Sequence, residues 1–533
     1  MEPSYGTALL IGFLCVVLVS TTSTIMSRKL GKLPGPRLHK ITSIPYLFHF
    51  MRGAADVYAD KLHRIYGPIV QVAPRQISVN DVSGLRDVFA VSRRLDRPEA
   101  LPFFHNYGAE NLVSTVSGDV HQDRRRPLRN IFSAKVASSD ALNDVISEAT
   151  AGMVALAKEK ATAVVEIKPL IQLALYDIMS FVVYGPAHKL NLVRDPEHRK
   201  AMQVDIDFQE KRQLSVATGF MFLLPAATLW LRRWGLAPKS IDGHFHLELV
   251  SDKLGREALA ALQASERGDS TDGYECLMQR LYAHWKENGG PSPAVPSIEY
   301  ILSDSLDNFW AGVSTTSDGL TPLFRWLSLP ENQDRQARLR EEIRQAVADA
   351  GVSSSFALSA DQLKQMPYLE AVIKETLRLH PPIPFSMERL VTKREAPVSV
   401  HGYPIPAGWK ISSQATYMQR AENVFDDSLA WRPERWLNGA KESREDMKDM
   451  KAHFLAFGAG PRMCLGMNIA WSAMRGVVAG VYGSSRTTIS EREKTPGDKS
   501  GNAQSTKVEG VVQAWIAERS RRTWLHFEDV EGV

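Results

Sequence analysis

The sequence predicts a mainly helical protein of the α+β class, with one large helical body, a small β-rich part and one transmembrane helix in front of them. Three observations favour this fold. Helical patterns cover much of residues 41–480, the strand patterns there are few and short, and residues 7–26 are uncharged and mostly apolar. No internal repeat and no Pro/Gly-rich linker divides residues 41–480, so we expect a single body.

Composition limits the class of protein. A chain of 533 residues with 44% hydrophobic residues can bury a large core, and its net charge of +4 is small for its length. No basic block interleaved with aromatic residues occurs, so nucleic acid is a poor candidate for a partner. The three cysteines, Cys15, Cys276 and Cys464, form no disulfide framework and favour a reducing compartment, although one Cys276–Cys464 bridge stays open.

The uncharged run at residues 7–26 is long enough to cross a membrane. A helix of twenty residues spans about 30 Å, the thickness of the hydrocarbon core of a bilayer. Five basic residues follow between positions 28 and 40 and none precedes the run, so the positive-inside rule places the body in the cytosol. We expect a single-pass anchor at residues 1–27 in the endoplasmic reticulum membrane. A cleaved secretory signal is the alternative, but such signals have basic residues in front.

A basic, proline-rich linker is expected at residues 28–40, where Pro34 and Pro36 prevent the membrane helix from continuing. The catalytic domain then covers residues 41–533. Within it, residues 484–520 are rich in Lys, Glu, Gly, Ser and Thr, which predicts an exposed insertion or a disordered loop.

Periodicity predicts individual elements in this domain: helices at 298–316, 330–350 and 361–379, and strands at 69–72, 77–79, 398–400 and 410–413. Leu339, Ile343 and Val347 repeat at the spacing of one helix face. Pro322, by contrast, removes a backbone N–H and should kink or end the helix that begins near residue 298.

Residues 457–466 read FGAGPRMCLG and contain the most informative cysteine. A lone cysteine is most often a small buried hydrophobic residue. Here Gly458, Gly460 and Gly466 permit close backbone approach and positive φ, which a loop pressed against a flat cofactor needs. A helix that starts directly after Cys464 would direct its first amides at the sulfur, and this favours the thiolate over the thiol.

This stretch resembles the haem loop of the cytochrome P-450 family, F-x-x-G-x-R-x-C-x-G, at every fixed position. The resemblance implies that Cys464 is the axial ligand of the iron of haem b, with Gly458 and Gly466 in the same cofactor-binding loop. It also implies that Phe457 packs near the sulfur and that Arg462 pairs with a haem propionate. With the motifs described next, the resemblance covers roughly residues 34–483 and is strongest to fungal microsomal members.

Glu375 and Arg378 stand at positions i and i+3 of the predicted helix 361–379, a spacing that by itself indicates a surface ion pair. The family has E-x-x-R on this helix and a later P-E-R-W segment, which is similar to residues 433–436. The resemblance implies that Glu375, Arg378 and Arg435 form a buried structural network that shapes the haem pocket.

Ala311, Gly312, Thr315 and Thr316 allow two interpretations. Small residues let helices pack closely together. Alternatively, the segment resembles the A-G-x-[D/E]-T-T motif of the family, which crosses the distal face of the haem, where the acid and the first threonine relay protons to bound oxygen. Ser314 occupies the acid position, and it can hold a water but no negative charge. The resemblance implies that Ser314, Thr315 and Thr316 are catalytic, and that Ala311 and Gly312 contact the haem.

Three more basic positions match the family. His121 and Arg125 lie in HQDRRR, a run that by itself indicates a solvated face, and Arg389 follows the turn after the E-x-x-R helix. The family has a His or aromatic residue followed four positions later by Arg at the first place, and an Arg at the second. The resemblance implies that all three side chains contact haem propionates.

The resemblance implies a monooxygenase that inserts one oxygen atom of O2 into a small, largely apolar organic substrate, in secondary metabolite biosynthesis. We expect the substrate near Phe103, Phe104 and Leu112. No nucleotide-binding glycine fingerprint occurs, so NADPH acts indirectly, through a separate membrane-bound flavoprotein reductase. Two alternatives stay open. Ser314 is compatible with an isomerase or dehydratase that uses no O2, and the polar residues 484–520 are compatible with a non-catalytic membrane haem protein.

Overall fold

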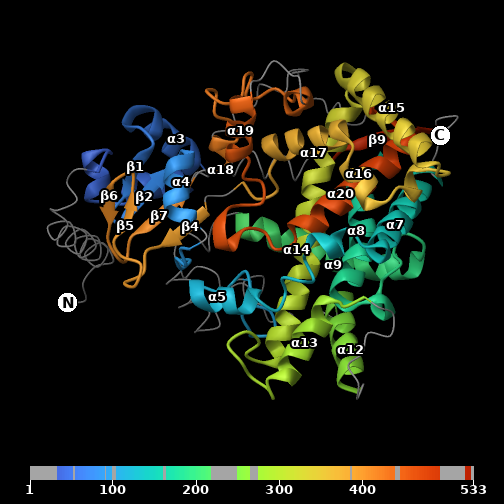
Figure 1. Ribbon diagram of the computed structural model, residues 1–533, viewed down its shortest axis with the longest axis horizontal. Helices are drawn as coiled ribbons and strands as arrows, with labels where there is room; N and C mark the ends of the chain where they lie inside the picture. Colours follow the sequence, from blue (N-terminus) through green and yellow to red (C-terminus); the bar gives the residue numbers. More distant parts are fainter. Residues whose placement is uncertain are drawn as a thin grey trace, which may run out of the picture.

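A computed structural model describes residues 33–51, 54–90, 92–98, 104–159, 164–217, 249–264, 274–384, 387–413, 415–437, 444–491 and 522–529. Four parts of the sequence predictions lie outside these described residues: the membrane anchor at residues 1–27, residues 28–32 of the linker, Phe103, and residues 492–520 of the polar segment. A sheet-rich part lies beside a larger helical part, which confirms the prediction of a mainly helical body with small sheets (Figure 1).

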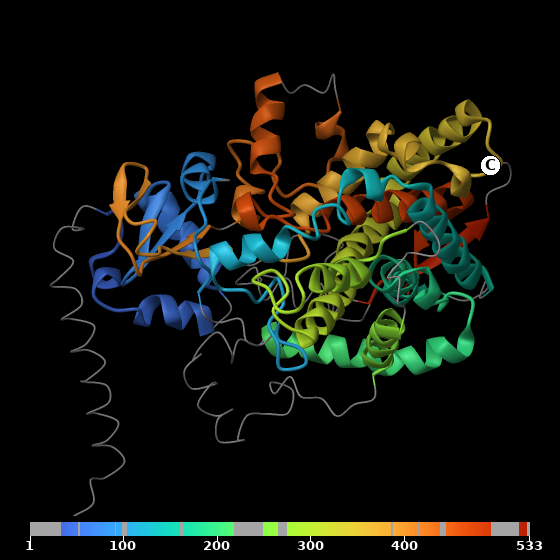
Figure 2. The same ribbon diagram turned by 60° about the horizontal axis from the view of Figure 1, so that its bottom comes forward.

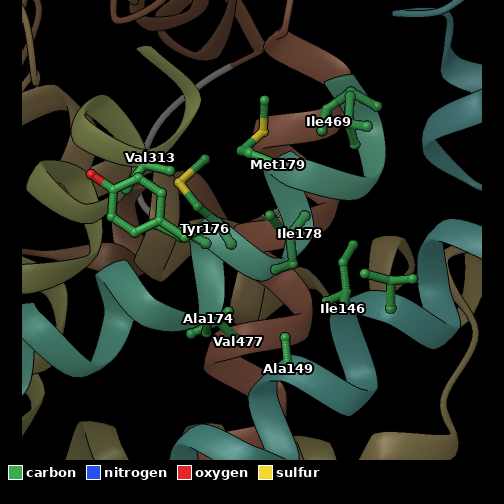
Figure 3. Close-up of a cluster of buried hydrophobic side chains, with 14 of the residues drawn as sticks. Ile146, Ala149, Ala174, Tyr176, Ile178, Met179, Val313, Ile469 and Val477 are labelled. Carbon is green, nitrogen blue, oxygen red and sulfur yellow. The ribbon is translucent and has the colours of Figure 1, made fainter. Parts of the chain in front are cut away.

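Four helices form the centre of the helical part. Helix α14 (Ile298–Ser328) packs along α8 (Ile167–Tyr184), and α7 (Asp140–Glu159) packs against α8. Helix α20 (Met467–Ser484) packs against α7 and contacts α14. Figure 3 shows side chains from all four meeting in one apolar cluster. Each large aliphatic side chain buried there contributes about 1.5–3 kcal/mol, so this cluster supplies much of the driving force for folding.

Helix α8 is also long and apolar enough to cross a membrane, and it is the one described helix of which this is true. Sixteen of its residues are buried inside the protein, including Lys168 and Asp177. A helix that is apolar all round is the normal composition for the centre of a large core. We therefore interpret α8 as a core helix, and it says nothing about the predicted anchor.

Two helix predictions need correction. The segment predicted as one helix at 361–379 forms α16 (Ala360–Lys364) and α17 (Pro367–Leu379), because Pro367 starts a new helix at its first position. Pro322 does not end α14, which continues to Ser328. The residues after Pro322, including Leu323, Phe324 and Leu327, are almost fully buried, so tertiary packing outweighs the lost backbone hydrogen bond.

The helix predicted at 330–350 is α15 (Gln333–Ala350), preceded by one 3-10 turn at Pro330–Asn332. Its predicted apolar face is buried, at Leu339, Ile343 and Val347. The other described α-helices are α2 (Ile44–Met51), α3 (Ala55–Tyr66), α4 (Val82–Phe89), α5 (Gly118–Arg125), α6 (Ala134–Ala137), α9 (Pro196–Ala217), α12 (Val250–Ala264), α13 (Leu277–Glu287), α18 (Ala415–Met418) and α19 (Arg444–His453). In Figure 1 and Figure 2, α5 (cyan) lies between the sheet-rich part and the helical part.

The main sheet has four strands in the order β1-β2-β7-β4. Strands β1 (Ile69–Ala73), β2 (Gln76–Val79) and β7 (Lys410–Ser413) confirm three predicted strands, and β2 and β7 are parallel. Strand β4 (Met387–Leu390) escaped prediction because it contains two charged residues in four. The fourth predicted strand, β5 (Val398–Val400), pairs with β6 (Tyr403–Ile405) in a separate hairpin.

The polar segment predicted from residue 484 begins with a strand, contrary to expectation. Strand β8 (Ser485–Ile489) pairs with β9 (Trp524–Asp529), which also pairs with β3 (Val165–Glu166). Thr487 is buried and its backbone N–H and C=O bond to the amide of Gln336. The polar composition misled because Thr487 satisfies its hydrogen bonds inside the protein, its hydroxyl bonding to Ser328 and Tyr482.

Replacing residues 492–521 by a short turn should leave the sheet intact, because the Ser490 N–H already donates to the Trp524 carbonyl at 2.9 Å. We expect a thermal unfolding midpoint close to that of the full chain, measured by circular dichroism. Deleting residues 486–518 instead removes most of β8 and leaves the Gln336 amide without its partners on Thr487. The free energy of unfolding should therefore fall by at least about 2 kcal/mol. Equal stability of the two deletions would contradict this assignment.

Candidate active site

The cysteine loop at residues 457–466 connects α19 to α20. Gly458 and Gly460 have φ of 72° and 70°, as expected. A Cβ at position 460 would lie 2.2 Å from the carbonyl oxygen of Phe89, so only glycine fits between the loop and α4. The Cys464 N–H donates to the Phe457 carbonyl at 2.9 Å, which closes the loop.

Gly466 is placed differently from the other two glycines. It is the N-terminal cap of α20, with φ of −81°, and a Cβ there would make ordinary contacts of 3.9 Å with Phe132. The sequence interpretation, which gave Gly466 the same need for positive φ, is therefore wrong at this position. Phe457 packs against Trp471, with ring centroids 6.0 Å apart.

Cys464 is a free, solvent-exposed cysteine, whereas Cys276 is free and buried. Protein nevertheless surrounds Cys464 on most sides, and this burial raises the pKa of its thiol. A hydrogen bond from the Gly466 backbone and the charge of Arg125 lower the same pKa, which is the effect expected of a helix N-terminus, but they are outweighed. Cys464 is therefore open to solvent on one side, and a bound metal cation would be what ionises it.

Four buried or half-buried basic side chains gather beside this loop, and we call Arg97, His121, Arg389 and Arg462 the cationic cluster. Burial, and after it the charges of its neighbours, lower the pKa of Arg389 and of Arg462 to about 9. Burial and the surrounding arginines also lower the pKa of His121 to about 2. The cluster thus holds like charges that repel one another.

Helix α5 positions its members of the site through the cysteine loop. Arg125 donates to the Met463 carbonyl at 2.8 Å, and Gln122 donates to the Pro461 carbonyl at 3.1 Å. His121 lies on the same helix and is 4% exposed. The structure thus brings His121 and Arg125 to the loop, where the solvated face suggested by the HQDRRR run alone would not have placed them.

On α14, Ala311 is exposed although it stands in the middle of a largely buried helix, so open space lies beside this turn. The Thr315 hydroxyl donates to the Ala311 carbonyl at 2.7 Å. Gly312 faces elsewhere, because a Cβ there would lie 2.6 Å from Met179 of α8. Gly312 thus permits the close packing of two helices, and its contact with a cofactor stays a prediction.

The remaining candidates on this helix differ in exposure. Thr316 is buried, and Ser314 is partly exposed, with its carbonyl accepting a hydrogen bond from Ser317 at 3.0 Å.

The structure brings Glu375, Arg378 and Arg435 together in the interior, each at most 1% exposed. The Glu375 carboxylate accepts from Arg378 at 2.8 and 2.9 Å and from Arg435 at 3.1 Å. The indole of Trp436 donates to the same carboxylate at 2.9 Å. Both guanidinium groups also donate to backbone carbonyls of residues 419–430, so they tie α17 to the chain that leads to the cysteine loop.

Comparison with known proteins identifies this arrangement. A model of the cytochrome P-450 family matches residues 34–481. The chain belongs to the cytochrome P-450 family. The family predicted from the motifs is thus confirmed, and the family binds haem.

Several curated cytochrome P-450 monooxygenases of fungi resemble this cytochrome P-450 over most of its length. The protein gsfF of Penicillium aethiopicum is 27% identical over 454 residues, which cover 83% of this chain and 85% of its own. FGM1 of Gibberella zeae is 25% identical and covers 91% and 92% of the two chains. The protein cicH of Emericella nidulans is also 25% identical, covering 90% and 93%.

The residues of this cytochrome P-450 fit a haem. The Nδ1 atom of His121 is buried and has no hydrogen-bond partner among the described residues. Asp96 acts on Arg462 and Asp307 acts on Arg97, and each carboxylate favours the charged guanidinium group. Burial has the larger effect, so the pKa of both arginines stays lowered. Propionates placed beside the cationic cluster would relieve its repulsion, and the exposed Cys464 could reach the iron.

Sequence reasoning missed Arg97, which donates to the Val113 carbonyl at 2.8 Å and acts electrostatically on His121, Arg389 and Arg462. It follows Arg93 and Arg94 in the chain, so nothing in a single sequence separates it from a solvated basic run. Arg97 differs from Arg93 and Arg94 only in the environment that the folded chain gives it.

Removing the carboxylate at Glu375 should destabilise the protein strongly. Glu375→Ala leaves Arg378 and Arg435 as buried charges without their acidic partner, which costs about 3–5 kcal/mol. Urea unfolding at neutral pH measures this loss. Glu341→Ala is a matched control, because Glu341 and Arg344 have the same i, i+3 spacing but are exposed. It should leave the unfolding free energy unchanged, and similar losses in both variants would contradict the prediction.

Proposed function

We propose that the protein is a haem-thiolate monooxygenase that inserts one oxygen atom of O2 into a small, largely apolar organic substrate in secondary metabolism. Family membership and the names of its relatives support the reaction class. The observation that carries the proposal is the exposed, free Cys464 in a glycine-bearing loop, with the cationic cluster beside that loop.

Haem, when bound, supplies the activation of O2 and the transfer of one oxygen atom to carbon. The chain supplies the ligand and the orientation. Cys464 would bind the iron from a loop held by Gly460 against α4, and backbone donors near the sulfur would tune the potential of the site. Arg389, Arg462 and His121, with Arg97 in addition, would hold the propionates.

Thr315 and Ser314 would handle water and protons on the α14 side of the site, with Thr316 buried behind them. The Thr315 hydroxyl donates to a backbone carbonyl, so its oxygen stays free to accept a hydrogen bond from a water molecule. Ser314 is partly exposed and can exchange a proton with such a water, although it offers no charge. Protons would then arrive through ordered water, where the family has a carboxylate.

We also propose the surroundings that the sequence predicts. Residues 1–27 would anchor the protein in the endoplasmic reticulum membrane by a single pass, residues 28–40 would link the anchor to the catalytic domain at 41–533, and that domain would face the cytosol. Electrons from NADPH would come through a membrane-bound flavoprotein reductase. Phe104 and Leu112 would line part of the substrate pocket with Phe103.

One alternative keeps a specific observation in its favour. Ser314 in place of an acid is compatible with a haem-thiolate isomerase or dehydratase that acts on a pre-oxidised substrate without O2. The non-catalytic haem protein depended on the polar residues from 484 onward disrupting the fold. Strand β8, at the start of these residues, pairs in full register with β9, so this alternative has no such support.

The reduced, carbon-monoxide-bound absorption spectrum tests the ligand. Wild-type protein should show the Soret band of a thiolate-ligated haem, because the Cys464 sulfur is the exposed thiol of the site. Cys464→Ala should lose that band, whereas Cys276→Ala should keep it, since Cys276 is buried in the core around α13. A wild type that binds no haem, or binds it through another residue, contradicts the proposal.

Turnover distinguishes the monooxygenase from the isomerase. With a fungal NADPH-dependent reductase and a library of apolar substrates, we expect product only when both NADPH and O2 are present, with one atom of 18O2 in the product. Ser314→Ala should slow turnover by about a hundredfold, the lower end of the roughly 100- to 10,000-fold range of a lost proton-transfer group. Product formed without reductase and O2 would instead favour the isomerase or dehydratase.

A further inference from the structure

The N-terminal half of α14 binds the chain segment at residues 106–116, which we call the clamp segment. Ser303 accepts from the Asn106 N–H at 3.2 Å and donates to the Ala109 carbonyl at 3.0 Å. The carboxylate of Asp304 accepts from the Leu112 N–H at 2.7 Å. Ser303 and Asp304 are both fully buried, so these bonds are shielded from water.

The clamp segment in turn holds two arginines of the cationic cluster. Arg462 donates to the Thr115 and Val116 carbonyls at 2.7 and 2.6 Å. Arg97 donates to the Val113 carbonyl at 2.8 Å, and its backbone N–H donates to the Val116 carbonyl at 3.0 Å. The directions of both guanidinium groups therefore depend on where residues 113–116 lie.

We propose that Asp304 is a positioning residue, whose carboxylate fixes the clamp segment so that Arg97 and Arg462 point at the haem propionates. The bond to Leu112 stands one residue before the first of the carbonyls that hold these arginines. Within the described residues, Asp304 is the carboxylate that accepts a hydrogen bond from the backbone of residues 111–116. Arg124 of α5 also donates to the Thr115 hydroxyl, and Asn111 and Ser114 bond to each other within the turn, but Asp304 is what joins this turn to α14. The inference rests on the haem site proposed above.

An ionised Asp304 lowers the free energy of unfolding, and a purely structural role would not require this charge. Burial raises the pKa of Asp304 to about 6, although the Leu112 N–H and the charge of Arg124 act against this. The ionised carboxylate therefore disfavours the fold above about pH 6, and a neutral side chain would be the more stable choice. An ionised acceptor forms a stronger hydrogen bond than a neutral one, which is what positioning needs.

The other charged groups near Asp304 are balanced or stay in one state at neutral pH. Arg124 of α5 forms an ion pair with Glu110 of the clamp segment and lies 4.9 Å from the ring centroid of Tyr300. Burial raises the pKa of Tyr300 further above its ordinary value, so its hydroxyl stays neutral. Asp307 stands one turn further along α14 and acts on Arg97. A change near pH 6 would thus report on Asp304.

Haem transfer from the full-length protein to apomyoglobin tests the proposal, because it measures how firmly the site holds haem without needing a substrate. Asp304→Leu removes the acceptor, and Asp304→Asn keeps a neutral one. Asp177→Leu is the matched control: Asp177 is also buried, its pKa is also raised to about 6, and it accepts from the Leu192 and Val193 N–H groups at 2.7 and 3.1 Å. Those residues hold none of the arginines.

At about pH 7.5 we expect haem transfer about tenfold faster from Asp304→Leu than from wild type, and an unchanged rate from Asp177→Leu. Asp304→Asn should lie between, with a thermal midpoint no lower than that of wild type. At about pH 5, wild type should approach Asp304→Asn, because its own carboxyl is then neutral. If Asp304→Leu fails to fold, the convergence of the transfer rates of wild type and Asp304→Asn at about pH 5 still tests the proposal.

Two results would overturn the inference alone: equal acceleration in Asp304→Leu and Asp177→Leu, or a constant ratio between wild type and Asp304→Asn at both pH values. A wild type without a thiolate-ligated haem spectrum would overturn the proposed function and the inference with it.

Discussion

The close packing of α14 against α8 is the contact on which the rest of the structure depends. At Gly312 the two helices approach so closely that a Cβ would collide with Met179. This contact fixes the position of α14, and α14 carries both Ala311 and Thr315 toward the open side and Ser303 and Asp304 toward the clamp segment. One helix thus sets the distal side of the site and, through the clamp segment, the arginines at its edge.

The chain concentrates unfavourable electrostatics where a cofactor belongs. Buried arginines beside a neutral histidine lower the stability of the polypeptide by itself, as does the carboxylate of Asp304. The network around Glu375 differs, because its carboxylate and two guanidinium groups satisfy one another almost completely. An anionic partner would stabilise the buried arginines beside His121, whereas the network around Glu375 is satisfied by residues of the chain.

Local patterns in the sequence predicted the family, the cysteine loop, four strands and three helical segments, because glycines, prolines and the E-x-x-R spacing act over a few residues. They failed where distant contacts decide. Pro322 stays inside α14 because buried neighbours hold the helix together, and Gly312 faces Met179 because of where α8 lies. Arg97 joins the site, and the Thr-rich start of the polar segment becomes β8, only through residues far away in the chain.

The main sheet joins segments that lie far apart in the chain. Residues 76–79 of β2 pair in parallel with residues 410–413 of β7, more than 300 positions later. During synthesis the early strands must therefore wait, with an unpaired edge, until nearly the whole chain has left the ribosome. Pairing of such high sequence separation is slow. The main sheet should therefore form late in synthesis, followed by the β3–β9 pair, which joins residues 165–166 to residues 524–525.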